Sequence, residues 1–214
     1  MLFEISIVMY IKVFEENPSQ RLMKQLNECL MDGGVIIYPT DTLYGFGCNI
    51  FKQKAIERIA KIKNVEISKN TFSIICSDLS QMADYAKPIE NHYFKIIKRC
   101  LPGPFTFIMD SNNKVPKHLN RKKKQVGIRI PGNNISRLLI ENLGNPILSS
   151  SIPIDNDEIE YSTDPELIYE RFKNSIDIMI DAGHGEIIPS TIVDLSSEGY
   201  EIIREGKGDI NLIY

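Results

Sequence analysis

Apolar residues follow two different spacings that alternate along the chain. In the first kind of segment they recur every three or four residues, as Leu22, Leu26 and Leu30 do, which is typical of one face of a helix. The second kind is a short apolar run bounded by glycine, proline or polar residues, such as Val35 to Tyr38, which indicates a buried strand. The alternation of the two kinds predicts a layered α/β domain.

The residues that flank these segments predict where the elements begin and end. Pro18 marks the first turn of the first helix, Gly33 and Gly34 follow its end, and Asn134 is expected to cap a later helix. The expected helices cover residues from 17–19 to 33–34, 55–63, 78–85, 90–100, 134–143, and from 163–166 onward. The expected strands cover residues 35–38, 72–76, 105–109, 126–130, 146–149, 176–180, 191–195 and 201–204. No repeat, low-complexity tract or linker divides them, so we expect one domain.

The composition is that of an ordinary globular protein, with 43% hydrophobic and 25% charged residues among 214. No apolar run reaches the ~20 residues that a membrane-spanning helix needs. Residues 1–8 are apolar but lack the basic start and cleavage site of a signal peptide, so we expect an extension or an extra edge strand. The four cysteines form no Cys-x-x-Cys pair, which argues against zinc and against a disulfide framework. We therefore expect a cytoplasmic protein without a membrane partner, and leave open whether it is a monomer or a homodimer.

The net charge of -3 conceals a strong asymmetry. Residues 95–129 contain ten lysines and arginines against one acid, whereas residues 155–171 contain seven acids against one base. A cluster this basic in an acidic protein is a candidate site for nucleotide phosphates or an RNA backbone. The alternative is a solvated surface, in which Arg121 to Lys124 form an ordinary loop.

Candidate chemistry begins directly after the expected strand at 35–38. Pro39 ends the strand, and two hydroxyls and a carboxylate follow in Thr40, Asp41 and Thr42. Gly45 and Gly47 come next, and we interpret them as positions where the backbone can approach a ligand. A loop at the end of a strand is where open α/β sheets build their sites. A polar turn, in which the aspartate bonds its own backbone, remains the alternative.

The stretch from Gly33 to Asn49 resembles the threonine-acid-threonine loop of the YrdC/TsaC/YciO family, the threonylcarbamoyl-adenylate synthase family. The resemblance covers residues 10–210 and is closest to the YciO branch, which leaves residues 1–9 as an N-terminal extension. It implies a single YrdC-like α/β domain, with helices packed on a twisted open mixed sheet and a central, concave, positively charged cavity.

The resemblance also implies which residues bind the substrates. Pro102 to Thr106 matches a proline-glycine-proline-x-threonine motif, and Ser190 precedes a matching apolar strand. The residues implied in threonine binding are Thr42, Thr106, Ser149 and Ser190. The residues implied in nucleotide binding are Lys63, Lys69, Arg129, Ser151 and Arg204.

The chain departs from the family pattern at two positions. The arginine of a lysine-x-arginine pair is replaced by Val65, and the asparagine of a serine-x-asparagine motif by Pro153 or its neighbour Ile152. Two implied cations also have ordinary alternatives. Arg129 interrupts an apolar strand and could form a structural ion pair, because an unpaired buried charge costs several kcal/mol. Arg204 could pair at the surface with Glu201 or Glu205.

The function that the resemblance implies is synthesis of threonylcarbamoyl-AMP from L-threonine, bicarbonate and ATP, in service of a tRNA modification. We expect positioning chemistry with no protein nucleophile, and Mg²⁺ held by phosphates and water rather than by protein ligands. The sequence has no nucleophile–histidine–acid arrangement and no P-loop. The competing hypothesis is a protein of the YciO type that binds double-stranded RNA or nucleotides, with weak or no synthase activity. A third possibility keeps the pocket but changes the acyl acceptor or the nucleotide.

Overall fold

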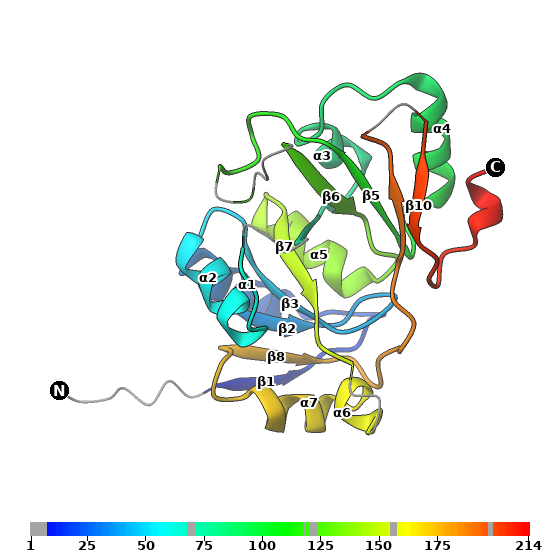
Figure 1. Ribbon diagram of the computed structural model, residues 1–214. Helices are drawn as coiled ribbons and strands as arrows, with labels where there is room; N and C mark the ends of the chain where they lie inside the picture. The colour runs from blue at the N-terminus through cyan, green and yellow to red at the C-terminus, as the bar shows by residue number, and fades with distance from the viewer. Residues whose placement is uncertain (1–7, 68–71, 118, 120–123, 155–157, 197–198) are drawn as a thin grey trace.

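A twisted ten-stranded sheet organises the computed structural model, which describes residues 8–67, 72–117, 119, 124–154, 158–196 and 199–214 (Figure 1). The strand order is β1-β8-β2-β3-β7-β4-β6-β5-β9-β10. The strands are β1 (Met9–Lys12), β2 (Ile36–Tyr38), β3 (Gly45–Asn49), β4 (Ser73–Ile75), β5 (Phe105–Asp110), β6 (Gln125–Arg129), β7 (Ile147–Ser151), β8 (Ile178–Asp181), β9 (Thr191–Asp194) and β10 (Glu201–Arg204). The sheet is mixed, because β8 pairs in parallel with β1 and β2 whereas β3 is antiparallel to both of its neighbours.

Helices pack on the sheet through two hydrophobic clusters. They are α1 (Gln20–Met31), α2 (Gln53–Ile62), α3 (Leu79–Ala83), α4 (Asn91–Cys100), α5 (Asn134–Leu143), α6 (Glu160–Thr163), α7 (Pro165–Phe172) and a terminal 3-10 helix, η1 (Ile210–Leu212). Leu26, Leu30 and Leu139 from α1 and α5 join alternate residues of β2, such as Ile36, in one cluster. The other cluster joins α2, α3, α4 and α7. These findings confirm the expected single α/β domain with a mixed open sheet. Within the described part of the chain, no helix is both long and apolar enough to cross a bilayer.

Two strands differ from the sequence-based expectation. The segment from Gly45 to Asn49, interpreted above as a ligand-approach loop, is strand β3 and lies between β2 and β7. Its two glycines lower its strand propensity, but pairing on both sides imposes the extended conformation. Strand β1 begins at Met9 at one edge of the sheet, while residues 1–7 of the expected extension lie outside the described residues. The boundary of that extension stays a prediction.

The start of α5 shows why one expected cap was wrong. Asn133, rather than Asn134, is the N-cap, and its side-chain oxygen accepts hydrogen bonds from the backbone N–H and the hydroxyl of Ser136 at 3.0 and 2.9 Å. The Ser136 hydroxyl also lies 2.9 Å from the carbonyl of Pro39, which is a second acceptor for its one proton. The cap therefore joins the start of α5 to the loop that follows β2.

Replacing Asn133 with alanine should lower the free energy of unfolding by about 1–2 kcal/mol, because a buried backbone donor loses its partner. Urea denaturation followed by circular dichroism measures the change. The matched control is Asn134→Ala, since the Asn134 side chain is partly exposed and donates to the carbonyl of Glu15 rather than capping the helix. An equal loss for the two variants would contradict this assignment of the cap.

Candidate functional site

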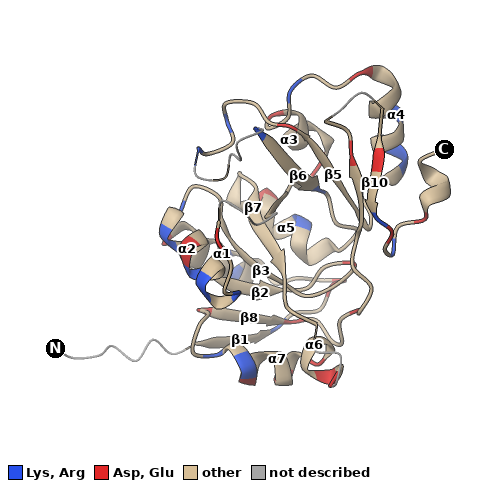
Figure 2. Cartoon of the chain, viewed as in Figure 1, with Lys and Arg blue, Asp and Glu red and all other residues tan. Residues whose placement is uncertain are grey.

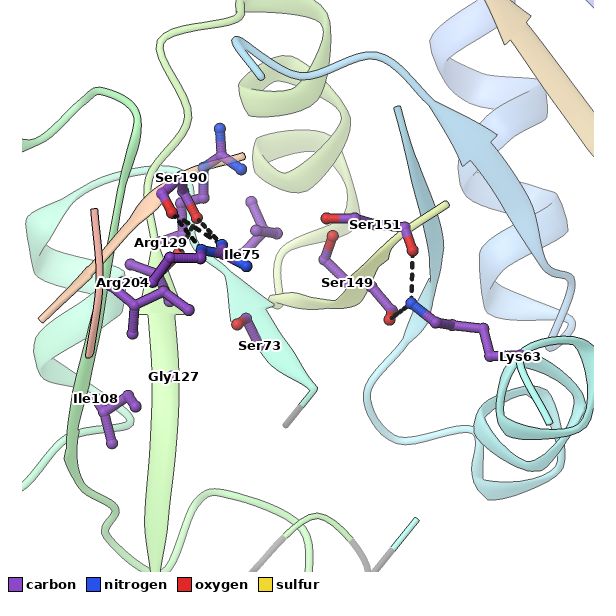
Figure 3. A pocket seen from close by; sticks show the side chains of 13 residues that line it. Lys63, Ser73, Ile75, Ile108, Gly127, Arg129, Ser149, Ser151, Ser190 and Arg204 are labelled. Atoms are coloured by element: carbon purple, nitrogen blue, oxygen red, sulfur yellow. Dashed lines mark hydrogen bonds between the residues drawn. The ribbon is translucent and has the colours of Figure 1, made fainter. Parts of the chain in front are cut away.

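A cavity of about 300 Å³ opens on one face of the sheet, where β7, β4, β6, β5 and β9 follow one another (Figure 3). Serine, threonine and basic side chains form most of its wall, and none of the lining residues is acidic. The lining residues are Lys63, Ser73, Ile75, Thr106, Ile108, Gly127, Arg129, Ser149, Ser150, Ser151, Ser190, Ile192 and Arg204.

The two-residue period of strands explains why these residues share one wall. Successive side chains of a strand point to opposite faces, so the residues that line one face are two apart, as Ser73 and Ile75 are. The register then aligns the strands, because Ser73 pairs with both Gly127 and Ser149, and Ile75 pairs with Arg129. A Cβ at Gly127 would lie 2.9 Å from the Ser73 hydroxyl, so a larger residue there would fill the space beside it.

One end of the cavity holds two guanidinium groups. Arg129 is ion-paired with Asp41, and its side chain is only 8% exposed. Nε of Arg129 and Oδ2 of Asp41 are buried and have no hydrogen-bond partner among the described residues. Arg204 donates from Nε and Nη2 to the carbonyl of Ser190 at 3.1 and 2.8 Å. Burial, and then the positive charge of Arg129, lower the pKa of Arg204, which shows that the two cations lie close enough to repel each other.

These contacts decide between the alternatives that the sequence left open. Arg129 forms a structural ion pair and also lines the cavity. Arg204 is held by Ser190, rather than by the surface pairs with Glu201 or Glu205 that the sequence also allowed. Because the carboxylate of Asp41 offsets only one of the two guanidinium charges, this end of the cavity suits an anion.

Hydroxyl groups lie beside the arginines. The hydroxyls of Thr106 on β5 and Ser190, just before β9, are hydrogen-bonded to each other at 2.8 Å, although they are 84 residues apart in the sequence. Both side chains are buried, at 5% and 6% exposed. The neighbouring Thr191 is engaged elsewhere, since its hydroxyl donates to the carbonyl of Gly208.

The other end of the cavity holds Lys63, the residue that follows α2 (Figure 3). Its Nζ donates to the hydroxyl of Ser150 at 2.8 Å and to the carbonyl of Ser151 at 2.6 Å. Burial lowers the pKa of the Lys63 amine. The lysine therefore lies against the last two residues of β7. Lys69, also expected in nucleotide binding, lies outside the described residues.

The threonine loop lies behind the arginine end of the cavity. Thr40 accepts a hydrogen bond from the backbone N–H of Thr42 at 3.0 Å, so the local turn is made by Thr40 and not by Asp41, which pairs with Arg129 instead. Its hydroxyl also lies 3.5 Å from Nη2 of Arg129. Thr42 is 1% exposed and is absent from the cavity wall. A second hollow of about 280 Å³ lies on the other side of this loop and includes Thr40 and Asp41.

Sequence reasoning missed two residues of this site. Ser73 lines the cavity at the start of β4, and Tyr38 donates a hydrogen bond at 2.7 Å to the Ser149 hydroxyl on its wall. A serine next to a short apolar strand is too common to single out by itself. Tyr38 looked like the last residue of a buried strand, and its partner is 111 residues away.

Metal ligands are not gathered at the cavity. Among the described residues, no three histidine, cysteine or acidic side chains are grouped as a metal site. The cavity wall has hydroxyls but no carboxylate. A divalent cation would therefore have to be held by ligand oxygens and water, as it commonly is with nucleotide phosphates.

A family model described as "Telomere recombination" and named for Sua5, YciO and YrdC matches residues 28–206. The chain belongs to the Sua5/YciO/YrdC family. This finding confirms the resemblance on which the site residues were chosen. The roles of the individual residues stay predictions.

Two members of the family differ in how their function is described. "Uncharacterized protein YciO" of Escherichia coli K12 is 38% identical over 202 residues, which cover 94% of this chain and 97% of YciO. A "Putative threonylcarbamoyl-AMP synthase" of Methanocaldococcus jannaschii is 33% identical over 199 residues, which cover 92% of each chain.

Solved structures extend the comparison. The crystal structure of E. coli YciO matches with a TM-score of 0.89 at 35% identity, over 97% of this chain and all of that one. The P. abyssi Sua5 structure complexed with L-threonine matches with a TM-score of 0.83 at 27% identity, over 93% of this chain and 58% of the longer Sua5 chain. This chain therefore shares its fold with YciO and with the matching part of Sua5.

Replacing Asp41 with alanine should lower the free energy of unfolding by about 3 kcal/mol or more, because it leaves the buried guanidinium of Arg129 without its carboxylate. Urea denaturation measures the loss. The matched control is Asp110→Ala, which breaks an exposed pair with Lys87 at 2.8 Å and should cost less than about 1 kcal/mol. Similar losses for both variants would show that the Arg129–Asp41 pair contributes no more to the free energy of unfolding than an exposed pair does.

Proposed function

We propose that the chain is a threonylcarbamoyl-AMP synthase that acts in the serine- and arginine-lined cavity. One observation carries the proposal: hydroxyls and two guanidinium groups meet at one end of a single cavity, and a lysine and three serines meet at the other (Figure 3). A ligand with two anionic parts suits this arrangement. The naming of the M. jannaschii relative and the L-threonine in the Sua5 structure support the choice of reaction.

The reaction needs positioning rather than a protein nucleophile. The amine of threonine attacks bicarbonate and gives a carbamate and water. A carbamate oxygen then attacks the α-phosphorus of ATP, and the bond to the bridging oxygen of the β-phosphate breaks and releases pyrophosphate. The protein has to hold the two anions together and stabilise the charge that develops on the leaving group.

We assign roles by the chemistry of the side chains, because hydroxyls and cations occur at both ends of the cavity. The hydroxyls of Thr106, Ser149 and Ser190 bind threonine. The cations Lys63, Arg129 and Arg204, together with Ser151, face the nucleotide. Thr42 is absent from the cavity wall and bonds Thr40, so we assign Thr42 to shaping the loop that holds Asp41 against Arg129. Mg²⁺ would accompany ATP on its phosphate oxygens, since the cavity wall has no carboxylate.

The two departures from the family pattern bear on nucleotide binding. Val65 and Pro153 carry no side-chain group that could bond a phosphate, and Lys63 is already bonded to Ser150 and Ser151. We therefore expect a synthase that binds ATP weakly, with the loss appearing mainly as a raised KM for ATP.

The test is to incubate the purified protein with ATP, bicarbonate and L-threonine, and to measure pyrophosphate release and the adenylate by mass spectrometry. Lys63→Met and Thr106→Val should each lower kcat/KM by roughly ten- to hundredfold, the effect of losing a hydrogen bond to a charged group. Lys61→Met is the matched control, because Lys61 lies on the same helix end but outside the cavity wall. Failure of the wild type to form the adenylate would overturn the proposal.

The competing function is binding of double-stranded RNA. Lys95, Lys98 and Arg99 lie exposed on α4, where Figure 2 shows basic residues. Other cations of the basic region are paired, since Lys114 lies 2.6 Å from a carboxylate oxygen of Asp84. Residues 120–123, which include most of the basic run, lie outside the described residues.

RNA binding through this region should weaken steeply with salt, because it releases counterions from the RNA backbone. Fluorescence anisotropy with a labelled RNA duplex at several salt concentrations measures this dependence. Replacing Lys95, Lys98 and Arg99 with glutamine should reduce the slope if α4 contacts phosphates. Salt-sensitive binding in a protein that forms no adenylate would favour this second function over synthesis.

A further inference from the structure

The side chain of Tyr38 crosses a neighbouring strand to reach the cavity wall. Tyr38 is the last residue of β2 and is 0% exposed. In the next strand, β3, a Cβ at Gly47 would lie 2.9 Å from the Tyr38 ring and a Cβ at Gly45 would lie 3.6 Å from it. The ring of Tyr38 therefore fits over β3 because Gly47 has no side chain.

The register explains how the ring spans the sheet. Tyr38 pairs with Gly45 across β2 and β3, and Gly47 pairs with Ser149 across β3 and β7. Because β3 has glycines at positions 45 and 47 on this face, the ring lies over them and the hydroxyl reaches the Oγ of Ser149 at 2.7 Å. The glycines that the sequence suggested as ligand-approach positions thus make room for a tyrosine.

The hydrogen bond has a direction. Burial raises the pKa of Tyr38 to about 12, so the phenol stays protonated at neutral pH and donates. A serine hydroxyl has one proton and two acceptor positions. Since the oxygen of Ser149 accepts from Tyr38, its own proton is left to donate to another group. Ser149 lines the cavity, where an incoming ligand supplies that group.

We propose that Tyr38 is a positioning residue that holds Ser149 as a hydrogen-bond donor toward an anionic oxygen of the ligand. The inference rests on the proposed function only in taking the cavity as the site of an anionic ligand. That oxygen belongs either to a carboxylate or to a phosphate, and the two are separated by the probes below.

The first experiment uses Tyr38→Phe, which removes one oxygen atom and leaves the ring in the space beside Gly47. Isothermal titration calorimetry with L-threonine and, separately, with inorganic pyrophosphate measures affinity. We expect a loss of roughly tenfold for the probe whose oxygen Ser149 contacts, and no change for the other. In a Ser149→Ala background, adding Tyr38→Phe should cause no further loss, because the two residues act as a unit.

The matched control is Tyr44→Phe. Tyr44 is also buried, at 1% exposed, and its hydroxyl donates to the carbonyl of Gly183, away from this cavity. Loss of that hydroxyl should lower stability without changing the affinity for either probe. A merely structural role for Tyr38 predicts the same result for both tyrosines.

A second measurement does not depend on any ligand. Crystal structures of the wild type and Tyr38→Phe should show the Ser149 hydroxyl in a different rotamer in the variant, and an unchanged rotamer would overturn the inference. Unchanged affinity in Tyr38→Phe, with a clear loss in Ser149→Ala, would also overturn it and leave the proposed function standing. Absence of adenylate from the wild type would refute the proposed function alone, because the rotamer comparison still decides the role of Tyr38.

Discussion

The buried pair of Arg129 and Asp41 is the interaction on which the site depends. A guanidinium on an otherwise apolar strand would be strongly destabilising without a carboxylate beside it. Meeting that requirement ties the loop after β2 to β6, two segments 88 residues apart. The pair is close to neutral as a unit, so the excess positive charge of the cavity comes from Arg204 and Lys63. Arg129 therefore shapes the cavity wall and adds little net charge to it. Its Nε is buried and has no hydrogen-bond partner among the described residues.

The pair also determines what the threonine loop does. Thr40 makes the local turn, Asp41 faces Arg129, and Thr42 is buried behind them. In the sequence these three residues look like equal candidates for ligand contact. In the structure they differ: Thr40 makes the turn, Asp41 is the counterion, and Thr42 packs beneath the loop. This difference depends on the position of Arg129 on β6, a strand far from the loop in the sequence. The loop thus supports the arginine end of the cavity from behind, without lining it.

Much of the fold could be predicted from the sequence, because most strands are short apolar runs and most helices carry a clear apolar face. Strand β3 could not, since Gly45 and Gly47 have low strand propensity and only pairing with β2 and β7 makes them extended. Among the site residues, Arg129 and Thr106 stand out in motifs. Ser73 and Tyr38 do not, because their roles depend on strand order and register, which place residues more than 70 positions apart in contact.

The two ends of the cavity differ in how far their cations are already paired with groups of the protein, and this difference bears on function. At the lysine end, Nζ of Lys63 already bonds two groups of β7, so a phosphate there must compete with Ser150 and Ser151. At the arginine end, the carboxylate of Asp41 offsets only one of the two guanidinium charges, so an anion there meets a positive charge that no carboxylate of the cavity wall neutralises. The absence of polar side chains at Val65 and Pro153 deepens the asymmetry. Within the proposed reaction, the arginine end therefore holds its anionic group more strongly than the lysine end does.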